Sequence, residues 1–157
     1  QLSRILVWKN PEAYPRDGGY QVLQGLYAIG SGGLLGKGLG QSIQKLSFLP
    51  EPQNDMIFAI IAEEFGLVGA VALIGVYCFL FSRGFRIAMR CPDTFGSLLA
   101  GGITTLLALQ TFINIAVATG SMPTTGVTLP FISAGLSSII VCMCAIGMLL
   151  SISRSCN

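Results

Sequence analysis

The sequence contains no histidine, and only 10% of its 157 residues are charged. Soluble proteins carry about a quarter charged residues, so this composition does not fit a soluble domain. The absence of histidine excludes Ser-His-Asp triads, imidazole bases and histidine metal sites from the chain. A net charge of +2 is too small to indicate a nucleic-acid partner. The five cysteines lack zinc-like CxxC spacing, and their odd number argues against a disulfide framework.

Charge is also missing from long stretches of the chain. Eleven of the 16 charged residues lie within residues 1–64, and none occurs in the 60 residues from Thr94 to Ser153. Apolar residues make up 52% of the whole. Long uncharged apolar runs are typical of segments that cross a bilayer. We therefore expect an all-α polytopic membrane protein.

Three apolar stretches are long enough to cross a membrane, namely residues 56–82, 95–119 and 136–153. The first is followed by Arg83, Arg86 and Arg90, and Arg154 follows the last. By the positive-inside rule, these basic ends and the C-terminus are cytoplasmic. Residues 1–55 then form an extracellular loop. Within it, the ten residues from Tyr20 to Ile29 are too short to span, which predicts a short interfacial or re-entrant helix.

A glycine-rich stretch follows that short helix. Residues 30–40 contain six glycines in eleven positions. Such a loop either cradles a phosphate with its backbone N–H groups or makes tight turns. The P-loop pattern fails, because Gly36-Lys37 is followed by Gly38 instead of serine or threonine. The turned loop is the favoured interpretation.

The acidic residues near the first span are candidates for function, because carboxylates at membrane depth are costly. Asp55 follows Pro50 and Pro52 and directly precedes the span, so it either caps the helix or faces the outer surface. In a straight helix, Glu63 and Glu64 would lie roughly 12 Å and 14 Å deeper than Asp55. They either pair with cations of a neighbouring helix or take part in the site.

Uncharged polar residues mark the second half of the chain. Gln110 and Asn114 share one face of the second span at i,i+4 spacing, and either hydrogen-bond between helices or line a substrate path. Residues 120–138 are uncharged but interrupted by prolines and glycines, and they carry the hydroxyls of Thr124, Thr125, Thr128 and Ser133. Non-helical backbone at membrane depth is tolerated where protein buries it or where it lines a cavity.

Several long motifs resemble the SEDS family (shape, elongation, division and sporulation). The string LPEPQNDMIFAIIAEEFGLVGA (49–70) is similar to the signature of that family. The similarity continues, in the same order, through residues 18–46, 90–97, 113–133 and 146–154. The stretches CPDTFGS and PTTGVTLPFIS resemble the FtsW and SpoVE branch more than the RodA branch. The resemblance covers essentially the whole chain.

The resemblance implies a fold of ten transmembrane helices in the bacterial cytoplasmic membrane. This chain, a single membrane-embedded region over residues 1–157, would supply the last three helices and the extracellular loop before them. Family members are peptidoglycan glycosyltransferases that polymerise lipid II with a class B penicillin-binding protein, among other divisome or sporulation proteins. The essential aspartate of the family matches Asp55.

The implied reaction assigns roles to further residues. Asp55 is the expected general base of an inverting glycosyl transfer. Lys45, Glu51, Thr125 and Ser133 are the expected substrate-binding residues, and Lys45, with Lys37 as a second cation, would hold the pyrophosphate charge. Glu63, Glu64, Gln110 and Asn114 are expected to shape the cavity. No protein metal site is expected, although a divalent cation (Mg or Mn) would suit a pyrophosphate. Two alternatives stay open: a lipid II flippase, and a non-catalytic scaffold for a penicillin-binding protein.

Overall fold

The computed structural model describes Trp8 and residues 19–38, 56–133 and 135–155. This part of the chain contains four helices and no strand: α2 (Tyr20–Gly32), α4 (Ile57–Arg90), α5 (Thr94–Ala118) and α6 (Leu136–Ser155). The last three are long and apolar enough to cross a membrane. The predicted all-α class is confirmed, and α5 and α6 lie within two residues of their predicted bounds.

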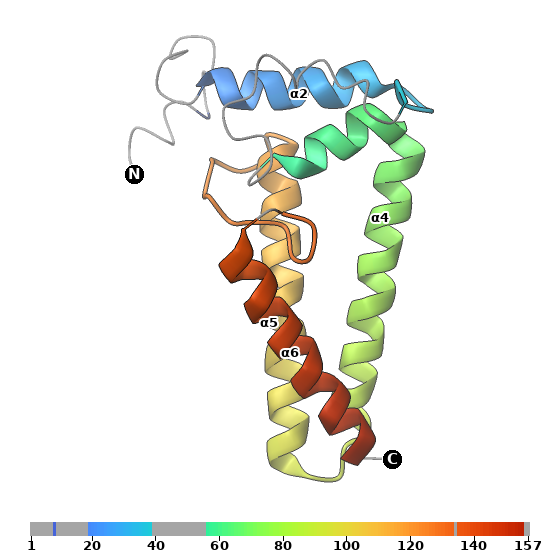
Figure 1. Ribbon diagram of the computed structural model, residues 1–157, viewed down its shortest axis with the longest axis vertical. Helices are drawn as coiled ribbons and strands as arrows, with labels where there is room; N and C mark the ends of the chain where they lie inside the picture. Colours follow the sequence, from blue (N-terminus) through green and yellow to red (C-terminus); the bar gives the residue numbers. More distant parts are fainter. Residues whose placement is uncertain (1–7, 9–18, 39–55, 134, 156–157) are drawn as a thin grey trace.

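The helix α4 is bent, and the bend sets the shape of the molecule. Gly66 has φ 69° and ψ −164°, which interrupts the helix. The segment before the bend lies next to α2 across one end of the bundle, and the segment after it runs down beside α5 (Figure 1). Glycine is the only residue that adopts such a conformation readily. The predicted straight span 56–82 therefore differs from the structure, in which the long segment begins after Gly66.

The bend changes the expected position of two acidic residues. Glu63 and Glu64 precede Gly66, in the segment that crosses the end of the bundle. The depth that a straight helix would give them does not apply. The other end of α4 also differs from expectation, since the helix continues beyond the predicted end at residue 82 and includes Arg83, Arg86 and Arg90. Arginine is a good helix former, and its long side chain reaches the membrane surface from within a span.

The spans α4 and α5 pack closely through small residues. A Cβ on Gly84 would overlap the side chain of Thr104, so glycine at this position allows the two helices to approach. The Thr104 hydroxyl donates to the carbonyl of Ala100, which satisfies it within an apolar surrounding. The Asp93 side chain caps α5 by accepting from the N–H of Gly96 at 2.9 Å. Such small-residue contacts are typical of helices packed in lipid.

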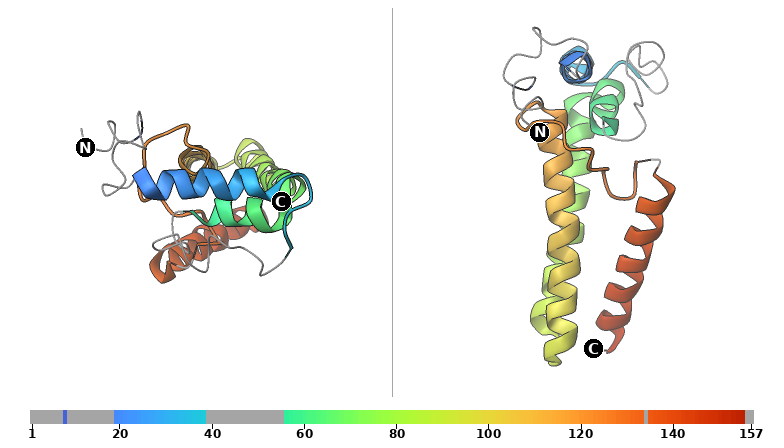
Figure 2. Two further views of the ribbon diagram at one scale, coloured as in Figure 1. Left: turned by 90° about the horizontal axis from the view of Figure 1, so that it is seen from above. Right: turned by 90° about the vertical axis from the view of Figure 1, so that its left-hand side faces the viewer.

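The apolar core lies at the end of the bundle that α2 crosses. It is built from α4 on both sides of its bend, the last turns of α5 and the loop after α5, and includes Phe58, Tyr77, Val117 and Leu129. Figure 2 shows α2 lying across this end when seen from above. Among the cysteines, Cys78, Cys142 and Cys144 are free, as expected. Cys91 is disulfide-bonded, which contradicts the expectation of no disulfide.

Candidate functional site

The candidate site is formed where α2, the first segment of α4 and residues 119–133 meet at one end of the bundle (Figures 1 and 2). Asp55, Lys45 and Glu51 lie outside the described residues. The residue that follows Asp55 in the sequence, Met56, occupies the N-cap position of α4 without a side-chain cap hydrogen bond. Its side chain is 1% exposed and packs beneath α2 next to Gly25. The entry of α4 is thus held firmly against α2.

A buried ion pair joins the glycine-rich loop to α4. Glu63 is fully buried, and its Oε1 accepts from Lys37 Nζ at 3.0 Å and from the Ser31 hydroxyl at 3.3 Å. The Lys37 side chain is 32% exposed. A buried carboxylate requires such partners, because desolvation otherwise disfavours its charge. The predicted alternative that Glu63 pairs with a cation is confirmed, although the cation comes from a loop and not from a neighbouring span.

The same loop is bound to α4 through its backbone. The N–H groups of Lys37 and Gly38 donate to the carbonyls of Glu63 and Glu64, at 3.0 Å and 3.1 Å. In the reverse direction, the N–H of Leu67 donates to the carbonyl of Gly33 at 3.0 Å. These bonds replace the helical bonds that the bend at Gly66 removes. The turned-loop interpretation is confirmed, and a phosphate cradle made by these N–H groups is wrong because protein carbonyls already occupy them.

The structure gives Lys37, which was expected to be a second pyrophosphate-binding cation, a partner within the protein. Its ammonium nitrogen lies 3.0 Å from Glu63 Oε1.

Glu64 differs from Glu63 in its surroundings. It is half-buried, and its Oε1 has no hydrogen-bond partner within the described part of the chain. No group of three His, Cys, Asp or Glu side chains that would suit a metal occurs among the described residues.

Residues 119–133 turn back into the protein over their second half. Leu129 and Ser133 are fully buried, and the Tyr77 hydroxyl donates to the carbonyl of Pro130 at 2.5 Å. Phe131 has φ 67°, which is uncommon for a residue with a side chain and marks a tight turn. Of the two possibilities that the sequence left open for this non-helical backbone, burial by protein applies to the part from Leu129 to Ser133. Thr125, by contrast, is exposed and remains accessible to a ligand.

Ser133 differs from its expected substrate-binding role. It is 0% exposed, and its hydroxyl oxygen accepts from the N–H of Leu129 at 2.9 Å. This bond closes the turn that contains Phe131. Ser133 therefore shapes the loop, because a fully buried hydroxyl that is used in this way does not face a substrate.

The two amides of α5 have separate environments. Asn114 is buried, and its Nδ2 donates to the carbonyl of Val127 at 2.7 Å, which fixes the loop to α5. Gln110 lines a cavity of about 250 Å³ between α5 and α6, together with Ser137 and Ser138. The expectation that both residues shape the interior agrees with these positions. The Val127 carbonyl that Asn114 binds belongs to the loop after α5.

Two functional contacts were not expected from the sequence. Tyr77 lies within a span, and its hydroxyl anchors Pro130 from 53 residues away. The sequence offered one signal for this contact: a tyrosine within an apolar span needs a hydrogen-bond partner for its hydroxyl if it is buried. Ser31 supports Glu63 from α2 and also donates to the carbonyl of Ala28 at 3.0 Å.

Comparisons with known proteins find similarity along the whole chain. The family described as "Cell cycle protein", comprising FtsW, RodA and SpoVE, matches residues 1–157. Stage V sporulation protein E of Bacillus subtilis is 49% identical over 154 residues, which cover 98% of this chain and 42% of that protein. The probable peptidoglycan glycosyltransferase FtsW of Trichlorobacter lovleyi is 46% identical over 153 residues, which cover 98% of this chain and 40% of that protein. The chain thus spans about two fifths of these relatives.

Solved structures share the arrangement of the helices. One, described as "Structural coordination of polymerization and crosslinking by a peptidoglycan synthase complex", matches with a TM-score of 0.79 and 34% identity, over 100% of this chain and 42% of that chain. The crystal structure of the rod shape determining protein RodA of Thermus thermophilus matches with a TM-score of 0.62 and 30% identity, over 98% of this chain and 54% of that chain.

Proposed function

The chain belongs to the FtsW/RodA/SpoVE family of multi-pass membrane proteins, and from this premise we propose that the full-length protein is a peptidoglycan glycosyltransferase. Its substrate would be lipid II, which it would polymerise into glycan strands during cell division or sporulation. The observation that carries the proposal is 46% identity, over 98% of this chain, to a protein named as a probable peptidoglycan glycosyltransferase. The described end of the bundle adds a structural reason, because it combines an exposed loop with a rigidly held start of α4.

In the proposed reaction, the Asp55 carboxylate takes the proton from the acceptor's hydroxyl. The freed oxygen attacks the anomeric carbon of the donor sugar, while the bond from that carbon to undecaprenyl pyrophosphate breaks on the opposite face, with inversion. A positioned base of this kind contributes typically ~10²–10⁴-fold in rate. Lys45 would hold the charge of the departing pyrophosphate, and Glu51 and Thr125 would bind the sugars. A divalent cation (Mg or Mn), which would suit the charge of the pyrophosphate, stays part of the proposal.

The described contacts give the site its rigidity. The Lys37–Glu63 pair and the backbone bonds around Gly66 fix the start of α4 against α2. Because Met56 is buried in the same contact, the residue before it in the sequence is attached to an anchored helix end. Catalysis by a positioned group depends on such preorganisation. These residues are therefore proposed to position the base and not to touch the substrate.

The proposed orientation places the α2 end outside the cytoplasmic membrane. Arg83, Arg86, Arg90 and Arg154 all lie in the last turns of α4 and α6, at the opposite end of the bundle. By the positive-inside rule that end, with the C-terminus, is cytoplasmic. The outer end would then meet lipid II and a class B penicillin-binding protein. The structural relative described as a peptidoglycan synthase complex supports a synthase partner of this kind.

The flippase is the second candidate, and one observation favours it. The cavity of about 250 Å³ beside Gln110, Ser137 and Ser138 offers a polar surface between α5 and α6. A path through the bilayer would use such groups. Against it, the described carboxylates Glu63 and Glu64 lie at the end of the bundle, whereas a transporter typically binds near the midplane.

The experiment that tests the proposal incubates the purified full-length protein with labelled lipid II, with and without a class B penicillin-binding protein. Glycan strands are expected from the unaltered protein, and Asp55→Asn should reduce them by about 10²-fold or more. The control is Asp93→Asn, which changes the carboxylate that caps α5 at the other end and should retain the rate. Transbilayer movement of lipid II without strands would favour the flippase. Strands formed at the normal rate by Asp55→Asn would remove Asp55 from the mechanism.

A further inference from the structure

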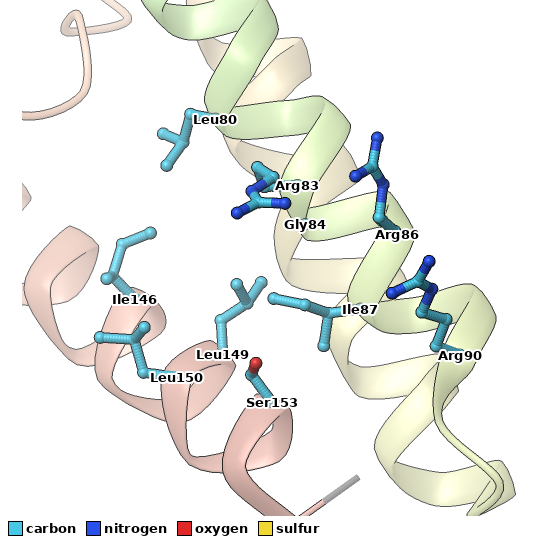
Figure 3. A pocket seen from close by; sticks show the side chains of 10 residues that line it. All are labelled: Leu80, Arg83, Gly84, Arg86, Ile87, Arg90, Ile146, Leu149, Leu150 and Ser153. Carbon is cyan, nitrogen blue, oxygen red and sulfur yellow. The ribbon is translucent and has the colours of Figure 1, made fainter. Parts of the chain in front are cut away.

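A basic cavity lies at the opposite end of the bundle from the proposed catalytic site. It has a volume of about 400 Å³ and lies between the last turns of α4 and the second half of α6 (Figure 3). Arg83, Arg86 and Arg90 line it from α4. Leu80 of α4, with Ile146 and Leu149 of α6, supplies an apolar surface. The cavity therefore combines three cations with a hydrocarbon-like wall.

The three arginines follow one stripe of α4. Their spacing of i, i+3 and i+7 places them on neighbouring turns of the same helix face. Figure 3 shows Arg83 and Ile87 extending into the space between the helices, where Leu149 meets them from α6. The apolar wall begins with Leu80, one turn further into the span. Charged and apolar side chains therefore alternate along the cavity, with Ile87 between Arg83 and Arg90 on α4 and Leu149 facing Ile87 from α6.

These cations have no anionic partner within the described residues. The sole ion pair among those residues joins Lys37 to Glu63, at the other end of the molecule. The one described carboxylate at this end, Asp93, accepts from the N–H of Gly96 as a helix cap. Arg83 stacks on the Phe79 ring, with 5.6 Å from its guanidinium carbon to the ring centre, which orients the group without neutralising it.

We propose that this cavity binds an anionic phospholipid. The guanidinium groups would hold the phosphodiester, since their planar forks match phosphate oxygens. An acyl chain would lie along Leu80, Ile146 and Leu149. Basic cavities between spans at the cytoplasmic surface suit anionic headgroups, and a cluster of cations there attracts the lipids of that leaflet. The site is separate from the proposed lipid II site, because it lies at the other end of α4.

The test uses the full-length protein in nanodiscs that contain phosphatidylcholine with or without phosphatidylglycerol. Native mass spectrometry counts the phosphatidylglycerol molecules that stay bound. The triple variant Arg83→Gln, Arg86→Gln, Arg90→Gln should bind this lipid about 100-fold more weakly, at about five-fold for each of the three basic side chains. Arg154→Gln is the matched control. It removes an exposed cation at the same end but outside the cavity lining, and should retain the lipid.

A second variant keeps the test decisive if the triple variant does not fold. Ile146→Trp fills the cavity without changing charge, and should also lose the lipid while eluting as the unaltered protein does on size exclusion. Equal retention by both variants overturns the proposal, as does equal loss in Arg154→Gln, which would indicate general attraction to a basic surface. Absence of bound lipid in the unaltered protein also overturns it, because another part of the full-length chain would then fill the cavity. Displacement by millimolar inorganic phosphate would indicate an ion site without lipid.

Discussion

Lys37 Nζ lies 3.0 Å from Glu63 Oε1 and joins the glycine-rich loop after α2 to the bent start of α4. The carboxylate is fully buried, while about a third of the lysine side chain is exposed. The pair spans 26 residues of sequence and lies beside the backbone bonds that flank Gly66. The ion pair and these backbone hydrogen bonds together hold the start of α4 against the loop after α2.

Replacing Lys37, the cation of this ion pair, should destabilise the protein. In Lys37→Met the buried carboxylate loses its charged partner, and we expect a loss of about 1–2 kcal/mol, reduced from the value for a fully buried pair because Lys37 reaches solvent. The measurement is thermal unfolding of the purified full-length protein. The double variant Lys37→Met, Glu63→Gln should recover part of the loss, since the buried charge is then gone. If Lys37→Met unfolds at the temperature of the unaltered protein, the pair contributes nothing.

Gly66→Ala should be more damaging. The backbone at this position has φ 69°, and an added Cβ would overlap the backbone nitrogen of Gly36. Strain together with the overlap should cost more than about 2 kcal/mol. Gly75→Ala is the matched control in the same helix, because a Cβ there meets nothing within 4 Å. It should leave stability unchanged or raise it by up to about 1 kcal/mol. Similar melting temperatures for the two variants would contradict the bend.

Tyr77→Phe should loosen residues 119–133. The change removes the hydroxyl that donates to the carbonyl of Pro130, at a cost of about 1 kcal/mol. Limited proteolysis of the full-length protein should then cut within 119–133 faster than in the unaltered protein. Tyr27→Phe serves as control, since Tyr27 is 59% exposed on α2. Equal cleavage rates in the two variants would show that the Tyr77 bond does not restrain the loop.

Residues 45 and 86 should lie on opposite sides of the membrane. The long segment of α4 after Gly66 separates the α2 end of the bundle from the turn that carries Arg86. Single cysteines placed at the two positions, in a background without other cysteines, should react with a membrane-impermeant maleimide in intact cells only at 45. Labelling at both positions from the same side would require a different topology.

The candidate site was only partly predictable from the sequence. The motif around Asp55 indicated a transferase, but Asp55, Lys45 and Glu51 lie outside the described residues and their roles stay predictions. The pairing of Glu63 with a cation was among the alternatives, whereas its partner Lys37 was expected to bind pyrophosphate. Ser133 was expected at the substrate, yet its burial assigns it to the turn around Phe131. The position of a serine in the sequence does not reveal whether its hydroxyl is already hydrogen-bonded to a backbone group.

The sequence by itself determined the membrane class, the number of spans and the family. Short stretches of sequence are enough to predict the spans and their orientation from hydropathy and the positions of arginines. The reason is that the bilayer acts as an apolar solvent on each segment separately. Only the tertiary structure decided where α4 bends and which cation reaches Glu63. The bend at Gly66 is stable because carbonyls and N–H groups of residues 33–38, about thirty residues earlier, replace the lost helical bonds. Tyr77 and Pro130 are likewise joined across 53 residues. Such partners are selected by packing in three dimensions, and no periodicity along the chain encodes them.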